Sequence, residues 1–239
     1  MSREILVETR DLAMHFGGVI ANEAVSFTLE TGELRCLIGP NGAGKSTFFK
    51  CLTGQLTPTE GSVMIGDTDT TNFEPHEVAR LGVGIKTQTP NVFDGLSVQE
   101  NVWLSARRWH SADRARAITR ETLERVRLGS LRSRSVGALA HGQRQWVELA
   151  MVMAAEPRLV LLDEPAAGMT DEETLFTAEL IREINRTASL IIVEHDMNFI
   201  RAIAEKVTVF HRGRILMEDT MEVISADPVV RDVYLGHKH

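Results

Sequence analysis

The stretch "GPNGAGKST", residues 39–47, decides the fold of this chain. It follows the apolar run "ELRCLI" (33–38) and leads into "FFKCLTG" (48–54), whose apolar residues recur with helical spacing. The stretch matches the pattern G-x-x-x-x-G-K-[ST], in which glycines let the backbone curl so that successive N–H groups point at phosphates. We therefore predict a buried strand, a phosphate-binding loop and a helix that ends near Gly54.

The residue types of this loop suit a nucleotide with a bound metal ion. Lys45 is expected to reach the β- and γ-phosphate oxygens, and Ser46 to offer its hydroxyl to Mg²⁺. A glycine-rich surface turn before a helix is the alternative, although the match would arise by chance in only roughly 1% of chains of this length. The expected nucleotide-binding residues are Gly39, Pro40, Asn41, Gly42, Ala43, Gly44, Lys45, Ser46 and Thr47.

The composition favours a cytosolic protein with one main core. Of the 239 residues, 43% are hydrophobic, which is enough for one sizeable core with a smaller lobe. The 26 basic and 33 acidic residues give a net charge of −7, which argues against a nucleic-acid partner. Cys36 and Cys51 lack metal-ligand spacing, and we expect two buried free thiols in a reducing compartment. We expect no leader and no membrane span, because no apolar run approaches the roughly 20 residues that a span needs.

The order of patterns along the chain predicts an α/β protein. Residues 4–32 alternate apolar and polar side chains around a turn at Gly17-Gly18, as half-exposed antiparallel strands do. Strands and helices alternate before residue 95 and again from residue 157, which predicts a parallel sheet covered on both faces. Between them, residues 96–156 have helical patterns only, and Ser97 with Glu100 forms a capping-box pattern. We expect one domain, with a catalytic core at 1–95 and 157–239 and an inserted helical subdomain at 96–156.

Two acidic residues follow the apolar strand pattern "RLVLL". Ligands of open parallel sheets bind outside the carboxyl ends of the strands, so Asp163 and Glu164 are expected to emerge beside the phosphate loop. Asp163 would orient Mg²⁺, usually through water, and Glu164 would align and polarise the attacking water. Two ordinary acids at the start of a loop are the alternative for this pair taken alone.

Two further polar residues end predicted strands. His195 follows "SLIIVE" and is expected to hydrogen-bond the γ-phosphate, whereas a lone histidine there would more often be a surface or capping group. Gln88, in "KTQTP", could reach Mg²⁺ or the attacking water, although taken alone it is an ordinary polar residue. Both interpretations depend on the phosphate loop and the acidic pair nearby.

The segment "LAHGQRQWVELAM", residues 139–151, predicts a helix after a short polar loop. Trp146, Leu149 and Ala150 fall on the apolar side, while Arg144, Gln145 and Glu148 fall on the other side. Unpaired N–H groups at a helix start attract anions, so the segment also predicts an anion contact.

Taken together, these motifs are similar to those of the nucleotide-binding subunits of ABC transporters. The resemblance covers essentially the whole chain and implies a RecA-like phosphate-loop ATPase core with an antiparallel β subdomain. It implies that Phe16, in "MHFGG", stacks on adenine. It also implies that two subunits associate head to tail, so that a signature segment of one subunit closes over the γ-phosphate held by the other. That segment comprises Leu139, Ala140, His141, Gly142 and Gln143.

Three residues depart from the family pattern. Ala140 stands where a serine hydroxyl would donate to the phosphate, a loss on the order of 1–3 kcal/mol if uncompensated. His141 stands in place of glycine; we expect it to point away from the phosphate, with donation by a protonated imidazole as the alternative. Thr170, in "AAGMTDEE", occupies a position usually held by Asp, which bears on contacts across the dimer. Because Glu164 and His195 are present, we expect a hydrolytically competent site.

Within the family, "PAAGMTDEET", "VEHDMNFI" and "HGQRQWVELAM" resemble importer ATPases for branched-chain amino acids, urea and short amides, most of all the urea type. The resemblance implies a second ATPase subunit, permeases that dock on the helical subdomain and, indirectly, an extracytoplasmic solute-binding protein. It implies a cytoplasmic protein, peripheral on the inner face of the cell membrane. The ATPase of a lipopolysaccharide-type lipid extractor is the alternative. A soluble ABC ATPase acting on DNA or ribosomes would carry two cassettes or a long coiled-coil insertion, and neither is visible.

Overall fold

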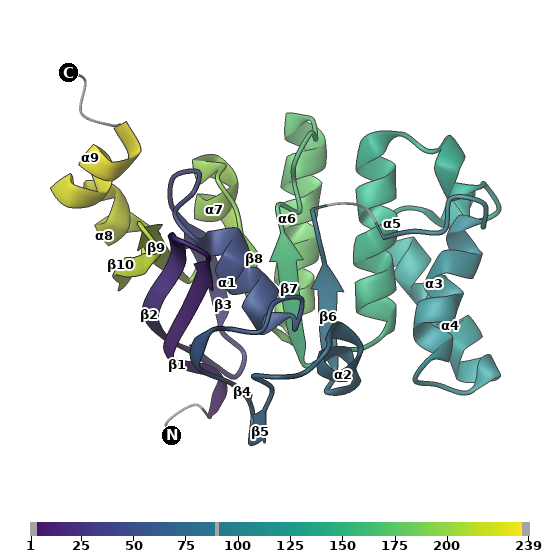
Figure 1. Cartoon of the computed structure of the whole chain (residues 1–239). Coiled ribbons are helices and arrows are strands. Elements are labelled where there is room, and N and C mark those ends of the chain that lie inside the picture. Colours follow the sequence, from purple (N-terminus) through teal and green to yellow (C-terminus); the bar gives the residue numbers. More distant parts are fainter. Residues whose placement is uncertain (1–3, 89–90, 236–239) are drawn as a thin grey trace.

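A six-stranded sheet forms the centre of the computed structural model, which describes residues 4–88 and 91–235 (Figure 1). Its strand order is β10-β9-β3-β8-β7-β6. The strands are β3 (Leu34–Ile38), β6 (Val83–Lys86), β7 (Leu159–Asp163), β8 (Ser189–Val193), β9 (Lys206–His211) and β10 (Arg214–Asp219). All neighbours pair in parallel except β9 and β10, which pair antiparallel. The prediction of a parallel sheet is therefore wrong at this edge, because the short turn after β9 returns the chain directly alongside it.

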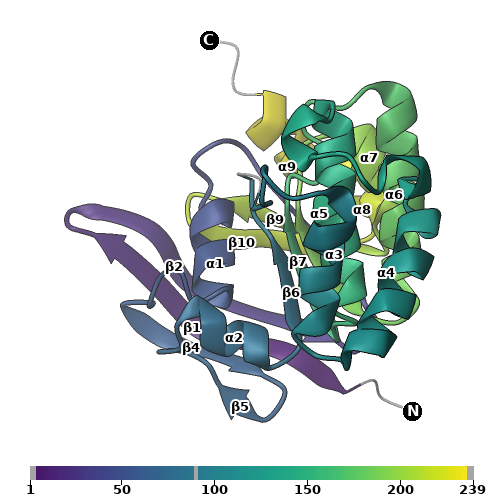
Figure 2. The same cartoon turned by 90° about the vertical axis from the view of Figure 1, so that its right-hand side faces the viewer.

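Successive residues of the central strands point into two cores on opposite faces of this sheet. Cys36 and Ile38 belong to a core shared with the helices of one face, whereas Leu37 packs with α1 (Lys45–Leu52) and the second sheet. Figure 2 shows the two layers on either side of the central strands. Both cysteines are buried free thiols, as predicted, and burial raises the pKa of Cys51 to about 11.

The second sheet has four antiparallel strands in the order β2-β1-β4-β5. Its strands are β1 (Ile5–Phe16), β2 (Val19–Glu30), β4 (Glu60–Ile65) and β5 (Thr68–Asp69). Residues 4–32 therefore form antiparallel strands, as their alternation predicts.

A buried arginine joins the two sheets. Arg35, on β3, is 1% exposed and lies over the Phe27 ring at 5.1 Å. Its guanidinium donates to Glu33 Oε1 at 2.6 Å and to Glu218 Oε1, on β10, at 2.5 Å. It also donates to the Thr28 carbonyl, on β2, at 3.3 Å. One planar group thus bonds strands of both sheets, which suits a guanidinium with its five donors.

The helical block consists of α3 (Val98–Arg107), α4 (Ala112–Arg125) and α5 (His141–Ala154), which pack against one another at one end of the molecule (Figure 1). The predicted capping box is confirmed, since Ser97 accepts from the Glu100 N–H and Glu100 accepts from the Ser97 N–H. The remaining helices are α2 (Pro75–Arg80), α6 (Asp171–Asn185), α7 (Met197–Ile203), α8 (Met221–Ala226) and α9 (Pro228–Leu235). None of the helices that the structure describes is long and apolar enough to cross a membrane.

The polar side predicted for α5 is partly buried. Gln145 is 2% exposed and Glu148 is 4% exposed, because this side of α5 packs against α3 and β6 instead of facing water. Glu148 Oε2 lies 3.6 Å from Lys86 Nζ, and Glu148 Oε1 accepts from the Asn91 N–H at 2.5 Å. The end of β6 and the helical block are therefore joined by a buried ion pair. Burial lowers the pKa of Lys86 and raises the pKa of Glu148.

The substitution Lys86→Met is expected to destabilise the protein by about 3–5 kcal/mol at neutral pH, because it leaves the Glu148 carboxylate buried without its partner. Chemical denaturation would measure the loss. An acid whose pKa is raised in the folded state stabilises it below its ordinary pKa and loses that contribution as the pH rises through the raised value. The deficit of Lys86→Met should therefore be smallest near pH 4–5 and should grow above that range.

The double variant Lys86→Met/Glu148→Gln provides the matched control. The amide removes the stranded charge and still accepts the hydrogen bond from Asn91, so most of the lost stability should return. Equal destabilisation of the single and double variants would show that the ion pair is not the cause.

Candidate functional site

The phosphate loop packs against the β subdomain on one side and is open on the other. A Cβ added at Gly44 (φ 103°) would lie 2.5 Å from the Ala21 carbonyl oxygen and 2.6 Å from Asn22 Nδ2, so only glycine fits there. A Cβ added at Gly42 (φ 78°) would meet nothing within 4 Å. The exposed side of the loop therefore leaves room for a group that approaches its backbone closely. Asn41, Gly42 and Ser46 are exposed, and Ala43 is buried.

The Lys45 ammonium already lies over the loop. Its Nζ donates to the carbonyl of Gly39 at 2.6 Å and to the carbonyl of Pro40 at 3.1 Å. Burial lowers the pKa of Lys45, and the negative charges of Glu164 and Asp163 partly offset this effect. The three predicted groups are thus close enough to influence one another electrostatically.

Asp163 and Glu164 emerge where β7 ends, as the strand pattern predicts. Burial, and next the adjacent charge of Glu164, raise the pKa of Asp163, while Lys86 and Lys50 oppose the shift. Glu164 has the left-handed backbone conformation (φ 47°), and its N–H donates to the Val193 carbonyl on β8 at 2.9 Å. The chain therefore turns sharply at Glu164, so the two carboxylates point in different directions from the end of β7.

Gln88 and His195 flank the Glu164 carboxylate. Gln88 Nε2 donates to Glu164 Oε2 at 3.2 Å, and His195 Nδ1 lies 3.5 Å from Glu164 Oε1. The His195 side chain is 64% exposed, so its other ring nitrogen is available to a ligand. The ends of β6, β7 and β8 thus bring together three residues that are far apart in the sequence. Thr89 and Pro90, also in the predicted Gln88 loop, lie outside the described residues.

Two supporting residues were missed by the sequence analysis. Glu194 is 2% exposed and its carboxylate accepts from the N–H groups of His195 at 2.8 Å and of Ala166 at 3.4 Å, so it fixes both strand ends. Its place between a buried strand and His195 is a signal that could have indicated it. Asn22 donates to the Gly44 carbonyl at 3.1 Å from a distant strand, and no local pattern indicates it.

The donor types at the site fit magnesium. The Ser46 hydroxyl, the Asp163 carboxylate and the Gln88 amide supply oxygen ligands of the kind that Mg²⁺ prefers. Within residues 4–88 and 91–235, no group of three or more His, Cys, Asp or Glu side chains could hold a metal ion by itself.

The predicted adenine contact and signature segment belong to other elements, the end of β1 and the start of α5. Phe16, at the end of β1, is 47% exposed, which suits a stacking surface. Ala140 is the N-cap of α5 and has no side-chain cap bond, while Leu139 is buried. The helix begins at His141, within the predicted signature segment, and it stands apart from α1 in both views (Figures 1 and 2). Gln143 Oε1 accepts from the Ala140 N–H at 3.3 Å.

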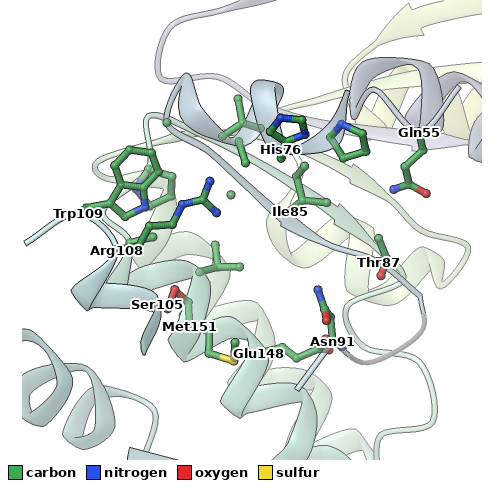
Figure 3. A pocket seen from close by; sticks show the side chains of 18 residues that line it. Gln55, His76, Ile85, Thr87, Asn91, Ser105, Arg108, Trp109, Glu148 and Met151 are labelled. Carbon is green, nitrogen blue, oxygen red and sulfur yellow. The ribbon is translucent and has the colours of Figure 1, made fainter. Parts of the chain in front are cut away.

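A separate groove of about 550 Å³ lies between the core and the helical block (Figure 3). Its walls come from α2 and β6 on one side and from α3 and α5 on the other. Arg108, Trp109 and His76 line its mouth, and Trp109 is 43% exposed. Thr87 and Asn91, on either side of the segment that contains Gln88, also line it. A group in this groove would therefore touch residues close to Gln88, whose side chain contacts Glu164.

A phosphate loop, paired carboxylates and a strand-end histidine together define an ATP-binding site of the phosphate-loop class. The family model described as "ABC transporter" matches residues 22–167. The branched-chain amino acid transport ATP-binding protein BraF of Pseudomonas aeruginosa is 34% identical over 99% of both chains. The chain belongs to the ABC transporter family, as an ATP-binding subunit with ATPase activity.

Other relatives agree with this assignment. The lipopolysaccharide export ATP-binding protein LptB of Acidithiobacillus ferridurans is 34% identical over 97% of both chains. Among solved structures, the ADP conformation of MJ1267, an ATP-binding cassette of an ABC transporter, has a TM-score of 0.88. It is 26% identical, and the match covers 98% of this chain and 99% of that one. The predicted fold class is therefore confirmed.

Proposed function

We propose that this chain powers an ABC importer for a small polar solute, with ATP hydrolysed at the ends of β6, β7 and β8. The observation that supports hydrolysis most directly is the position of Glu164 between Gln88 and His195. A carboxylate held in this way can accept a proton from water that attacks the γ-phosphate. His195 then offers a ring nitrogen to the γ-phosphate, and Lys45 exchanges its two loop carbonyls for phosphate oxygens.

The bound magnesium would be held by Ser46 and Asp163, with Gln88 nearby. When bound, Mg²⁺ supplies charge neutralisation at the β- and γ-phosphates.

The active unit that we propose contains two ATPase subunits, arranged so that the signature segment of one meets the nucleotide of the other. The start of α5 supports this arrangement: its cap residue, Ala140, makes no side-chain cap bond, and the Ala140 and His141 side chains are exposed. N–H groups at such a helix start bind anions. The second subunit is another copy of this chain or a related ATPase.

We further propose that the groove between the core and the helical block receives a segment of the permease. Its exposed indole and guanidinium, from Trp109 and Arg108, suit an amphipathic segment with an acidic residue. Such a segment would contact Thr87 and Asn91, and so would sense the position of Gln88. The chain would then be peripheral on the cytoplasmic face of the membrane.

Purification of the tagged full-length chain from native membranes tests this proposal. We expect a permease with several spans, a second ATPase and, after mild cross-linking, a solute-binding protein. Arg108→Glu/Trp109→Ala should reduce permease capture at least about tenfold with ATP binding unchanged. Val223→Ser, which alters an exposed apolar residue on α8, serves as the control.

The partners captured also distinguish the alternative. A permease without a solute-binding protein, together with bound lipopolysaccharide, would favour lipid extraction, which the similarity to LptB keeps open. The solute itself is proposed as a branched-chain amino acid, urea or a short amide. The relative BraF favours the first of these, and the motifs "HGQRQWVELAM" and "AGMTDEET" favour the second. Uptake of labelled solutes by vesicles that contain the captured complex would decide among them.

A further inference from the structure

The start of α5 is fastened to the loop that follows Glu164 in the same subunit. His141 Nε2 lies 3.0 Å from the Ala167 carbonyl oxygen. The ring also covers Gly168, where an added Cβ would come within 3.2 Å of Nε2. Gly142 lies against Glu173, whose carboxylate oxygen would be 2.3 Å from a Cβ at Gly142. We call these five residues, His141, Gly142, Ala167, Gly168 and Glu173, the signature latch.

The hydrogen bond to Ala167 determines that the Nε2 atom of the His141 imidazole carries a proton. A carbonyl oxygen can only accept, so Nε2 must carry the proton that it donates. Gln145 lies 3.4 Å from the same Nε2 through its amide nitrogen, and its Oε1 is buried without a partner. Rotation of this amide by 180° would turn Oε1 toward the Nε2–H, so that the one proton is shared between the Ala167 carbonyl and Gln145 Oε1. His141 is therefore a donor toward the loop, in a position where the family pattern has glycine.

The Glu173 carboxylate is also fixed by hydrogen bonds. Its Oε2 accepts from the Thr170 N–H at 2.9 Å and from the Thr170 hydroxyl at 3.1 Å, in the capping box that begins α6. Thr170, another departure from the family pattern, thus fixes the carboxylate that packs on Gly142. Two of the three departures, His141 and Thr170, therefore lie where the start of α5 meets the loop before α6.

The loop between these contacts is short and leads directly to Glu164. The Ala167 N–H donates to the Glu164 carbonyl at 3.3 Å, and the Ala166 N–H donates to Glu194 at 3.4 Å. A shift of Ala167 can therefore be passed through this hydrogen bond to the backbone at Glu164, which has the left-handed conformation.

We propose that His141 is a positioning residue, which ties the signature segment to the Glu164 loop so that the two move together. This inference rests on the proposed function, because the signature segment meets a nucleotide only in the two-subunit unit. In the dimer, the start of α5 of one subunit contacts the γ-phosphate that is bound by the other subunit. Through the latch, this contact holds Glu164 of the subunit that contributes α5 in the position from which it acts on its own nucleotide. The latch couples the two sites of the dimer through one side chain.

Two substitutions at His141 separate the effect of its hydrogen-bond donor from the effect of its side-chain volume. His141→Leu fills a similar volume without a donor, whereas His141→Gln places an amide N–H at a similar reach. We expect His141→Leu to lower kcat about two- to tenfold, as expected for one lost hydrogen bond, with KM for ATP within about twofold. His141→Gln should restore most of kcat. His110→Gln, in the connection between α3 and α4, is the matched control and should resemble the wild type.

Hydrogen exchange provides a readout that needs no turnover. In the full-length protein, amides 166–170 should exchange about two- to tenfold faster in His141→Leu than in the wild type or in His141→Gln. The proposal is wrong if His141→Leu leaves both kcat and this exchange unchanged, or if the Gln and Leu variants behave alike in both. If rates cannot be measured, exchange alone decides. If the wild-type protein neither binds nor hydrolyses ATP, the proposed function is refuted. The hydrogen-exchange comparison would then still test the latch by itself.

Discussion

Replacement of Glu164 by Gln is expected to lower kcat for ATP hydrolysis by about 100- to 10,000-fold, the range that a general base contributes. The amide cannot accept the proton of the attacking water, yet it keeps the size of the carboxylate and its contact with Gln88. ATP should still bind, because Lys45 and the phosphate loop are unchanged. The variant should therefore accumulate an ATP-bound dimer, which gel filtration with light scattering would detect.

The control for this experiment is Glu121→Gln, which removes an exposed carboxylate from α4. It should hydrolyse ATP at the wild-type rate and should not accumulate a dimer. Sustained wild-type turnover by Glu164→Gln would exclude Glu164 as the base and would turn attention to His195.

The second large effect is expected for Lys45→Met, which should weaken ATP binding and lower the rate about 100-fold or more. Methionine preserves much of the apolar stem but removes the ammonium that lies over the Gly39 and Pro40 carbonyls. Because burial lowers the pKa of Lys45, the folded protein disfavours the charged form there. The melting temperature without nucleotide should therefore not fall, although stabilisation by ATP should be lost.

Titration calorimetry with ATP and thermal melts would measure both quantities. Lys206→Met, at the exposed start of β9, is the matched control and should retain ATP binding. Unchanged ATP affinity in Lys45→Met would contradict the assignment of the phosphate loop, and a large drop in melting temperature would show that Lys45 supports the fold itself.

Local patterns predicted the parts of this protein that depend on local conformation. The glycines of residues 39–44, the apolar strand before Asp163 and the capping box at Ser97 each require particular residue types at fixed spacing. Parallel strands end at one edge of a sheet, so Gln88, Glu164 and His195 could be placed together before their contacts were known.

Contacts between distant segments could not be predicted in the same way. Helical spacing shows that Glu148 lies opposite the apolar stripe, but not that Lys86 approaches from another strand and makes burial possible. Periodicity likewise does not show that β10 turns back beside β9, or that Asn22 reaches the Gly44 carbonyl. His141 could be recognised as a departure, but its acceptor, Ala167, is 26 residues away.

Arg35 has a consequence for the way in which this ATPase can change shape. Its guanidinium bonds to β2 and β10 at once while it is almost completely shielded from water, so a rotation of one sheet against the other would cost its hydrogen bond to the Thr28 carbonyl and its contact with the Phe27 ring. During the ATPase cycle we therefore expect the two sheets to move together.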